Sequence, residues 1–382
     1  MSNSQSSESG NKISKFERKK FWNNDMEAII GIMIVLIILG TINVFSSSFI
    51  LAESEFDTPY FFLKRHIINV VIGFVIFAIC FRIDYHVWRR FMPFILGFSI
   101  ISLILVLLIG AQVNGAKRWL SIFGVTQFQP AEFCKLVSIL MMAAYLSFQI
   151  QKERVINIFT PQMAIIGAMF VLTELEPDMG TASIIAGIPL IMMVVAGLDR
   201  KKVMFLVIAV LVGAAGLIAY QPYRLERLKV VFDPWSDAQN VGYQTVQSLS
   251  AIGSGELTGM GLGVGVSKYD YLPEAHTDFA FAIFCQENGF LGAIFVFMLF
   301  AAFAVYAVRI SSIARDVYGQ ILAMGIMILI VGQAIGNLFM VGGMFPVVGI
   351  PLPFISYGGT SMIVTMAAIG ILVNIGRLGK KN

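Results

Sequence analysis

The chain has 382 residues, of which 57% are hydrophobic and 13% charged, and it contains 32 Phe and 20 Met. This composition excludes an ordinary soluble protein with one core and a polar surface, and it indicates a polytopic membrane protein. The net charge of +4 is small and reflects the loops of a membrane protein, so nucleic acid is not an expected partner.

Residues 1–25 are polar, Ser-rich and basic, which favours a disordered cytoplasmic tail over a cleaved signal. Apolar runs of about 20 residues, the length that crosses a hydrocarbon layer of roughly 30 Å, then recur along the chain. Runs this continuous cannot be the alternating strands of a barrel. The predicted fold is therefore all-α, a bundle of about ten transmembrane helices in a domain of residues 26–378, with a cytoplasmic tail at 379–382. The ten spans are expected near 28–51, 67–81, 92–111, 131–149, 159–175, 179–197, 203–220, 278–308, 318–343 and 359–376.

Lys and Arg in the connections predict the orientation of this bundle. If the N-terminus is cytoplasmic, 18 of the 27 Lys and Arg fall on the inner side and 8 on the outer side. Both termini are therefore expected in the cytoplasm of a cell whose inner membrane holds the protein. Of the 23 Asp and Glu, 14 lie on the outer side or at outer helix ends, so the chemistry is expected outside the cytoplasm.

Three outer connections stand out. Residues 112–130 carry the sequence NGAKRW, and residues 221–277 form a long extracytoplasmic loop between spans 7 and 8. In that loop Tyr243, Val246 and Leu249 recur at helical spacing, which predicts a short amphipathic helix on the membrane surface. The third connection, 344–358, holds three prolines at apparent membrane depth. Irregular backbone there must be buried or line a cavity, so a cavity is expected in the outer half.

Cys80, Cys134 and Cys285 all fall in apolar spans, which suggests neither a disulfide framework nor a metal site. The run GMGLGVGVSK at 259–268 lacks the Gly-Lys-Ser/Thr ending of a phosphate loop. A P-loop is therefore rejected, and the glycines are read as allowing a tight backbone path.

Lys117 and Arg118 precede Trp119 on the outer side, where cations are disfavoured. They are candidates for contacts to an anionic ligand such as a phosphate or pyrophosphate. Attraction to lipid headgroups, with Trp119 as an interfacial anchor, is the alternative.

Glu132 and Lys135 stand at i and i+3 near the start of the fourth span. Ionisable groups there are expensive unless they are paired or face a cavity, so they mark either a functional site or a structural ion pair. Glu287 in the eighth span is the other charge within the membrane, and it is read either as a contact to a polar neighbour or as a reactive group.

Glu274, His276 and Asp278 come within five residues, just before the eighth span. Asp278 is either a cap at the start of a helix or a carboxylate whose pKa is raised by partial desolvation, so that it acts as a general base. His276 is more often a hydrogen-bonding loop residue than a ligand.

Taken together, the motifs NGAKRW, QPAEFCKL, EPDMGTA, YLPEAHTDF and GIPLPFISYGGTS resemble the SEDS family of cell-wall proteins, which includes FtsW, RodA and SpoVE. The resemblance runs from the first span to the last, with the motifs in the family's order. GYQTVQSL and YLPEAHTD are more similar to the division branch, FtsW, than to the elongation branch, RodA. Departures occur at Gln286–Gly289, where the family usually has Glu-Glu-Leu-Gly, at Ala131 for Ser, and at Lys117, where Arg or a small residue is frequent.

The resemblance implies a glycosyltransferase that polymerises lipid II, the undecaprenyl-pyrophosphate-linked disaccharide-pentapeptide, into peptidoglycan outside the cytoplasmic membrane. It implies that Asp278, in the family's HTD motif, is the essential residue and the base. Lys117 and Arg118 would contact pyrophosphate, Glu132 and Lys135 would shape the cavity, and Glu274 and His276 would form its rim.

The implied partners are lipid II, membrane lipids, a class B penicillin-binding protein and other divisome proteins at the septum. A divalent cation such as Mg²⁺ could assist at the diphosphate, although no ligand cluster indicates one. A lipid II flippase, an elongation polymerase of the RodA type and a scaffold that recruits a transpeptidase are the competing interpretations.

Overall fold

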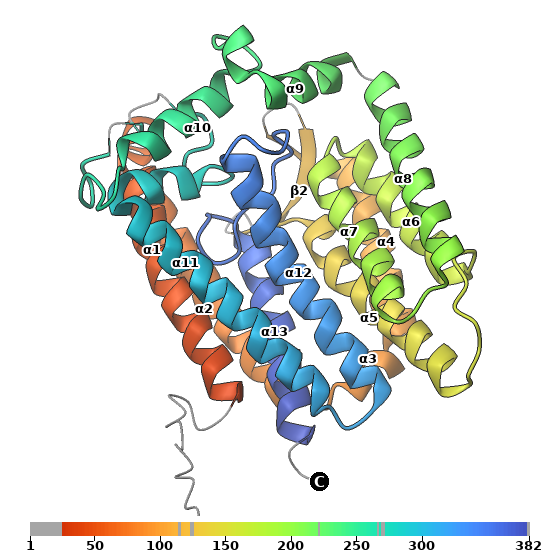
Figure 1. Cartoon of the computed structure of the whole chain (residues 1–382). Helices are drawn as coiled ribbons and strands as arrows, with labels where there is room; N and C mark the ends of the chain where they lie inside the picture. Colours follow the sequence, from red (N-terminus) through yellow and green to blue (C-terminus); the bar gives the residue numbers. More distant parts are fainter. Residues whose placement is uncertain are drawn as a thin grey trace, which may run out of the picture.

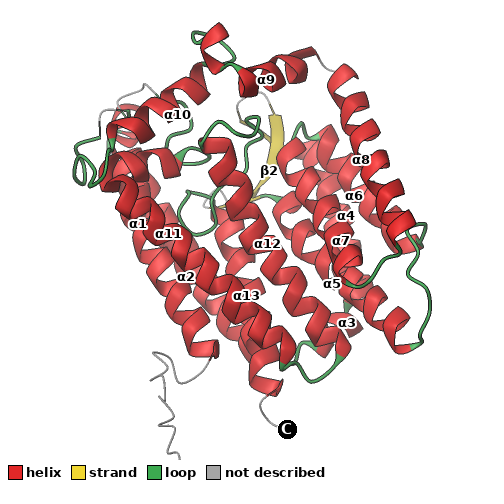
Figure 2. Cartoon of the chain, in the orientation of Figure 1, coloured by secondary structure: helices red, strands yellow, loops and turns green. Residues whose placement is uncertain are grey.

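The computed structural model describes residues 25–113, 116–122, 126–220, 222–265, 267–268 and 272–379. Apart from Asp25, the predicted N-terminal tail lies outside the described residues, as do residues 380–382 of the predicted C-terminal tail. Almost all of the described chain is helical (Figure 2). The elements are α1 (Asp25–Phe56), α2 (Phe61–Arg82), α3 (His86–Arg90), α4 (Met92–Ile109), β1 (Ala111–Val113), β2 (Ala116–Ile122), β3 (Thr126–Phe128), α5 (Pro130–Gln151), α6 (Pro161–Leu175), α7 (Met179–Val195), α8 (Arg200–Tyr220), α9 (Pro222–Phe232), the 3-10 turn η1 (Pro234–Asp237), α10 (Tyr243–Ser254), α11 (Ala280–Ser312), α12 (Val317–Val341) and α13 (Gly359–Gly379).

The predicted helical bundle is confirmed, with a helix at each of the ten expected spans. Among the described residues, seven helices are long and apolar enough to cross a membrane, namely α1, α2, α4, α5, α11, α12 and α13. The apolar helices α6 and α7 are shorter, and α8 occupies the expected span at 203–220. The protein is therefore a multi-pass membrane protein.

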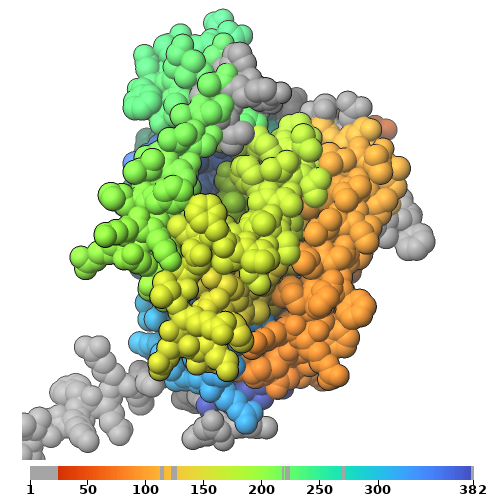
Figure 3. All heavy atoms as spheres, turned by 90° about the vertical axis from the view of Figure 1, so that its right-hand side faces the viewer, coloured from red at the N-terminus to blue at the C-terminus, as the bar shows by residue number. Residues whose placement is uncertain are grey.

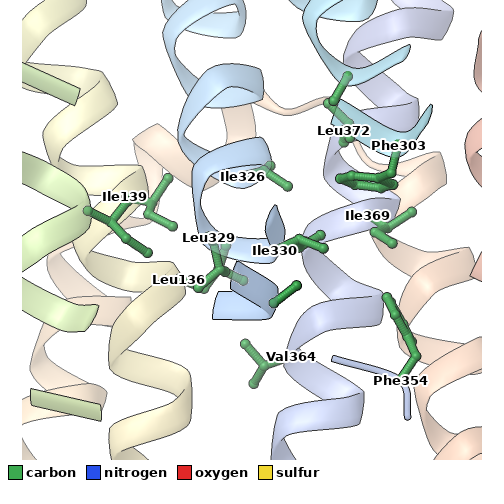
Figure 4. Close-up of a cluster of buried hydrophobic side chains, with 14 of the residues drawn as sticks. Leu136, Ile139, Phe303, Ile326, Leu329, Ile330, Phe354, Val364, Ile369 and Leu372 are labelled. Atoms are coloured by element: carbon green, nitrogen blue, oxygen red, sulfur yellow. The ribbon is translucent and has the colours of Figure 1, made fainter. Parts of the chain in front are cut away.

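The two central helices are α5 and α13, which have the largest buried shares of the seven candidate spans. They are also less apolar than the peripheral helices α4 and α11. Helices in lipid gain little from hydrophobicity alone, so a central helix is selected for close packing and polar contacts. Leu136 and Ile139 of α5 meet Ile326 and Leu329 of α12 in the core, which continues to Phe303 of α11 and to Ile369 of α13 (Figure 4).

The helices α9 and α10 lie across one end of the bundle, whereas α1 begins and α13 ends at the opposite end (Figure 1). The predicted helix in the long loop is confirmed as α10. Its buried residues are Thr245, Val246, Ser248 and Ala251, and Ser248 Oγ donates to the Val341 carbonyl at 2.7 Å. The helix therefore packs on protein through Val246, one of the three residues whose spacing predicted it, and its place at the membrane surface stays a prediction.

A small antiparallel sheet of order β1-β2-β3 occupies the connection expected at 112–130. Ala111 pairs with Trp119, and Leu120 pairs with Phe128. Each strand is short, and the segment offers no long alternating pattern, so sequence periodicity did not reveal it. Side chains alternate between the two faces of a strand, and this alternation separates the neighbours Lys117 and Arg118.

The helix α11 is broken at Gly289, whose φ of 65° and ψ of −168° lie outside the helical region. The run of residues that resembled a phosphate loop pairs with the backbone at this break. Met260 N donates to Gln286 O at 3.0 Å, and Gly261 N donates to Glu287 O at 3.1 Å. In return Phe290 N donates to Glu256 O at 2.9 Å. The loop thus satisfies backbone groups that a broken helix would leave without partners.

Gly289→Ala is expected to destabilise the protein by at least about 1–3 kcal/mol, the cost of strained backbone at a non-glycine residue. A Cβ there would also lie 2.3 Å from Gly259 N. The measurement is thermal unfolding of the purified protein in detergent. Gly167→Ala is the matched control, because nothing lies within 4 Å of a Cβ at that helical position. Equal melting temperatures for Gly289→Ala and Gly167→Ala would contradict the prediction.

A buried ion pair fastens the same loop to the bundle. Lys268 Nζ lies 2.9 Å from Glu287 Oε1, and the two side chains are each 1% exposed. Ser46 Oγ of α1 donates to the same carboxylate oxygen at 2.5 Å, and Gly263 N donates to it at 3.1 Å. Glu287 is therefore a structural contact between the loop, α1 and α11, as the polar-neighbour interpretation predicted.

The helix α8 stands at the edge of the bundle. Between α8 and α7 the surface is hollowed, and atoms of the C-terminal part are visible inside (Figure 3). None of the α8 side chains that the structure describes is buried. Leu211 and Val212 are among its most exposed. The helix therefore contributes length and apolar surface, but no described core residue.

Candidate functional site

A cavity of about 790 Å³ lies at the end of the bundle that α9 crosses, and the irregular 344–358 segment, which predicted a cavity, lines it. It is enclosed by α1, α2, β2, the starts of α5, α7 and α13, the helix α9 and the loops before α11 and α13. Charged side chains of both signs line it. The cations are Arg65, Arg118, Arg224 and Arg227, and the carboxylates are Glu55, Glu132, Asp178, Glu274 and Asp278.

Asp278 is half-buried in the cavity wall, on a tight turn before α11. Thr277 N and Phe279 N both donate to Glu274 O at 3.2 Å. From α12, Asn337 Nδ2 donates to Asp278 O at 2.8 Å and to Ile350 O at 2.7 Å, which ties this turn to the neighbouring loop. The N-cap of α11 is Phe279, with no side-chain capping bond. The structure thus excludes capping of α11 as the role of Asp278.

The environment of Asp278 disfavours its charge. Burial, followed by the carboxylates of Glu274 and Asp178, raises the pKa of the Asp278 carboxyl to about 7, against the opposing effect of Arg118 and Arg227. A carboxyl with such a pKa can exchange a proton near neutral pH, which is what a general base requires.

Glu274 and His276 also line the cavity. Thr277 Oγ1 donates to Glu274 Oε2 at 2.6 Å. Burial lowers the pKa of His276, against the opposing effect of Glu274, so the imidazole is neutral at neutral pH. Tyr357 N donates to His276 O at 2.8 Å, which joins the rim to the loop before α13.

Glu132 and Lys135 form the expected ion pair, with 2.7 Å between Oε2 and Nζ. Only Glu132 lines the cavity. Lys135 Nζ also donates to Gln333 Oε1 at 2.9 Å, and Gln333 Nε2 donates to Pro351 O at 2.9 Å. The pair therefore links α5 to α12 and, through Gln333, to the loop before α13 that lines the cavity.

The structure separates the two predicted cations of β2. Arg118 lines the cavity, while Lys117 is exposed and does not. Arg118 Nε donates to the Glu176 carbonyl at 3.1 Å, and Nη2 donates to the Pro177 carbonyl. Adjacent residues of a strand point to opposite faces, so the two cannot both contact one ligand in the cavity.

Three cavity arginines were missed by sequence reasoning. Arg224 forms an ion pair with Glu174, and Arg227 Nη1 donates to Val347 O at 2.6 Å. Both come from α9, where their i, i+3 spacing within an unexpected helix was the available signal. Arg65 of α2 lies over the Phe61 ring, 4.3 Å from its centroid. These arginines give the cavity several cations suited to a phosphorylated ligand.

Asp178 caps α7, since its Oδ1 accepts from Thr181 N at 3.1 Å. Its Oδ2 accepts from Gln129 Nε2 at 2.9 Å. The nearby Glu176 does not line the cavity, and burial together with Asp178 raises its pKa to about 9. Glu176 is therefore protonated at neutral pH. Among the described residues, no group of three or more His, Cys, Asp or Glu side chains could hold a metal ion.

Known proteins share this sequence and this fold. The chain is 36% identical to stage V sporulation protein E of Bacillus subtilis, over 92% of this chain and 97% of that protein. It is 37% identical to a probable peptidoglycan glycosyltransferase FtsW of Trichlorobacter lovleyi, over 94% and 95%.

Solved structures with the same fold have lower identity. One is a chain from a study of polymerisation and crosslinking by a peptidoglycan synthase complex, with a TM-score of 0.73, 23% identity and coverage of 93% of this chain and 98% of that chain. Another is the rod shape determining protein RodA of Thermus thermophilus, with a TM-score of 0.65, 22% identity and coverage of 91% and 95%. The model of the family described as cell cycle protein, FtsW/RodA/SpoVE, matches residues 26–381. The chain therefore belongs to this family of FtsW, RodA and SpoVE, which its motifs predicted.

Proposed function

We propose that this protein is a peptidoglycan glycosyltransferase that polymerises lipid II at the outer face of the cytoplasmic membrane. The observation that carries the proposal is Asp278, a carboxyl with a pKa of about 7 in the wall of a cavity that arginines also line. Relatives that carry the name peptidoglycan glycosyltransferase FtsW, at 34–37% identity, support the same activity.

The proposed reaction joins the 4-hydroxyl of one sugar to the anomeric carbon of another, and undecaprenyl pyrophosphate leaves that carbon. Asp278 takes the hydroxyl proton as the new C–O bond forms. The bond to the diphosphate breaks on the opposite face, so the configuration inverts. Pyrophosphate leaves without protonation, so one base suffices, whereas glycoside hydrolysis requires an acid and a base.

The leaving diphosphate is assigned to Arg118 and Arg227, because both line the cavity and both act electrostatically on Asp278. Preorganised cations stabilise charge that develops on a leaving group. A divalent cation such as Mg²⁺ is compatible with this site if the diphosphate supplies most of its oxygen ligands. An ion bound in this way needs only one or two carboxylates from the protein. Glu274, which also lines the cavity, is the carboxylate that would hold such a cation, and the cation would supply further neutralisation of the diphosphate.

Septal synthesis with a class B penicillin-binding protein is the proposed setting. The relatives named FtsW and stage V sporulation protein E are 34–37% identical to this chain, whereas the RodA structure is 22% identical. The proposed topology has both termini in the cytoplasm. It is supported because α1 begins and α13 ends at the end of the bundle away from α9 and α10 (Figure 1).

The deciding experiment supplies lipid II to the purified protein in liposomes, with its cognate penicillin-binding protein present. Glycan polymer that requires this protein supports the proposal. Transbilayer movement of lipid II without polymer would instead establish a flippase. Absence of both activities in the complete complex would leave a scaffold and overturn the proposal.

Activity is expected to rise with pH to a plateau, with a midpoint near 7. The carboxyl of Asp278 must be ionised to accept a proton. Its raised pKa of about 7 means that the ionised fraction falls about 10-fold for each pH unit well below that value. The measurement is kcat/KM for polymerisation between pH 5 and 9. A profile that stays flat from pH 6 to 8 would contradict the assignment of Asp278 as base.

Arg118→Gln is expected to lower kcat by about 10²-fold, the effect of removing one preorganised donor from a developing anion. Lys117→Gln should change kcat by less than about 2-fold, since Lys117 is exposed and outside the cavity lining. Polymerisation rates of the two variants provide a matched comparison on one strand. The reverse order of effects would place the diphosphate on the other face of β2.

A further inference from the structure

Three aromatic side chains from separate parts of the chain meet in the cavity wall. Phe62 of α2, His276 of the turn before α11 and Tyr357 of the loop before α13 all line the cavity. The ring centroids of Phe62 and His276 are 4.6 Å apart, those of Phe62 and Tyr357 are 5.4 Å apart, and those of His276 and Tyr357 are 5.7 Å apart. All three residues are half-buried. We call Phe62, His276 and Tyr357 the aromatic wall.

The aromatic wall is fixed beside Asp278. His276 lies two residues before Asp278 on the same turn, and its carbonyl accepts from Tyr357 N at 2.8 Å. Asn337 holds the Asp278 carbonyl at 2.8 Å. A ligand packed on the wall would therefore lie within reach of the carboxyl.

Polar groups continue along the same face of α2. Phe62, Arg65 and Asn69 stand at i, i+3 and i+7, so they share one helix face, and all three line the cavity. Asn69 approaches Gly359 closely, because a Cβ at Gly359 would lie 2.7 Å from Asn69 Nδ2. The glycine thus makes room for an amide that can both donate and accept hydrogen bonds.

This combination matches the chemistry of a sugar ring. A pyranose has C–H groups on its faces, which pack on aromatic rings, and hydroxyl or amide groups around its rim, which need hydrogen-bond partners. Ligand sites combine aromatic walls with a few placed polar groups in this way. The lowered pKa of His276 leaves its ring neutral at neutral pH, so the ring can pack on or hydrogen-bond a neutral sugar.

We propose that the aromatic wall is the subsite for the acceptor sugar, the ring whose 4-hydroxyl Asp278 activates, and that Asn69 hydrogen-bonds the rim of this ring. The inference rests on the proposed function and specifies the substrate group for one part of the site. Phe62, Tyr357 and Asn69 are positioning and specificity residues in this assignment, because the proton goes to Asp278.

The acceptor fits this wall better than the donor does. The reacting carbon of the donor carries the diphosphate, so the donor sugar must sit where the cations near Asp278 can reach that group. Those cations are Arg118 of β2 and Arg227 of α9. Arg65, the cation beside the wall, interacts with Tyr357 and with the Phe61 ring and is not among the charges that act on Asp278. The reacting hydroxyl of the acceptor carries no phosphate and needs only the ring contact and the base.

The test separates donor from acceptor with two substrates. Lipid II whose 4-hydroxyl is capped serves only as donor, and the disaccharide-pentapeptide without diphosphate serves only as acceptor. Coupling is measured for the full-length protein with its penicillin-binding protein while each substrate is varied in turn. Phe62→Leu and Tyr357→Leu are expected to raise the half-saturating acceptor concentration by about 10-fold, the size of one strong aromatic contact. The half-saturating donor concentration should stay unchanged.

Conservative and neighbouring variants guard against a general loss of structure. Phe62→Tyr and Tyr357→Phe keep the rings and should restore acceptor saturation to within about 2-fold of the unmodified protein. Phe74→Leu removes an exposed ring of the same helix that does not line the cavity, and it should leave both saturation curves unchanged.

Binding of the acceptor to the Asp278→Asn protein provides a second readout that needs no catalysis. Phe62→Leu in that background should weaken acceptor binding by about 10-fold and leave binding of undecaprenyl pyrophosphate unchanged. Equal acceptor binding with and without the Phe62 ring, or equal losses for both ligands, would overturn the proposal. If the unmodified protein makes no coupling product, the proposed function fails, and the binding result still decides whether the wall holds a sugar.

Discussion

Asp278→Asn is expected to lower the rate of glycan polymerisation by about 10²–10⁴-fold, the contribution of a positioned general base. Asn has nearly the same shape as Asp, so the turn from Glu274 to Phe279 and the bond from Asn337 to the Asp278 carbonyl should persist. The amide cannot take the proton of the sugar hydroxyl. The measurement is the initial rate of polymer formation from lipid II in the complex with the penicillin-binding protein.

Asp57→Asn is the matched control for this prediction. Asp57 is exposed, lies on the same side of the membrane as Asp278 and does not line the cavity. Its φ of 54° is tolerated by Asn as well as by Asp, so the rate should be unchanged. A folded Asp278→Asn protein that polymerises at the rate of the Asp57→Asn control would remove Asp278 from the mechanism.

Lys268→Met is expected to reduce the free energy of unfolding by about 3–5 kcal/mol, because it leaves the Glu287 carboxylate buried without its cation. Glu287 is 1% exposed, so water cannot replace the lost partner. The loss should begin in the loop that pairs with the break in α11, since Gly263 N shares the same carboxylate oxygen. Unfolding of the purified protein in detergent, followed by circular dichroism, measures the change.

Two further variants test whether the unpaired charge causes the loss. Lys268→Met combined with Glu287→Leu removes both charges and should recover most of the stability, because an apolar pair of similar volume often replaces a buried ion pair without cost. Lys229→Met on α9 removes an exposed cation and should change the free energy of unfolding by less than about 1 kcal/mol. A double variant less stable than Lys268→Met alone would count against the explanation.

Much of the bundle could be predicted because lipid imposes a simple rule on the sequence. Each span must be apolar over about 20 residues, so all ten helices appear in the hydropathy pattern. The rule says little about backbone outside lipid. The strand that contains Lys117 and Arg118 is seven residues long and belongs to a sheet of three short strands, whose partners only the folded chain brings together.

The site was predicted in part, for reasons that individual residues make clear. Arg118, Glu132, Glu274, His276 and Asp278 line one cavity, and each stands in a recognisable motif. Lys117 does not line the cavity, because side chains alternate between the two faces of a strand. The expectation for Lys117 did not take this alternation into account. Arg224 and Arg227 were predicted to lie in a loop, since the sequence of α9 has no apolar run that would predict a helix.

The break in α11 shows a different limit. Gly289 stands inside a long apolar run, so hydropathy predicts an unbroken span there. The helix can break because residues Glu256–Gly261 supply backbone partners from a distant part of the chain. The local sequence contains the glycine, but it does not indicate which residues supply the backbone partners. In the same way, no local pattern predicts that Lys268 pairs with Glu287.

The exposed helix α8 has a consequence for how this protein can evolve. Since Ile208 and Val212 are exposed on this helix, an exchange of Ile208 for Leu, or of Val212 for Ile, leaves the environment of these side chains the same. Natural selection would then conserve the length and the hydrophobicity of this helix, while the individual residues could change. Orthologues should diverge faster along this segment than along α13, where nearly every position has a neighbour to satisfy.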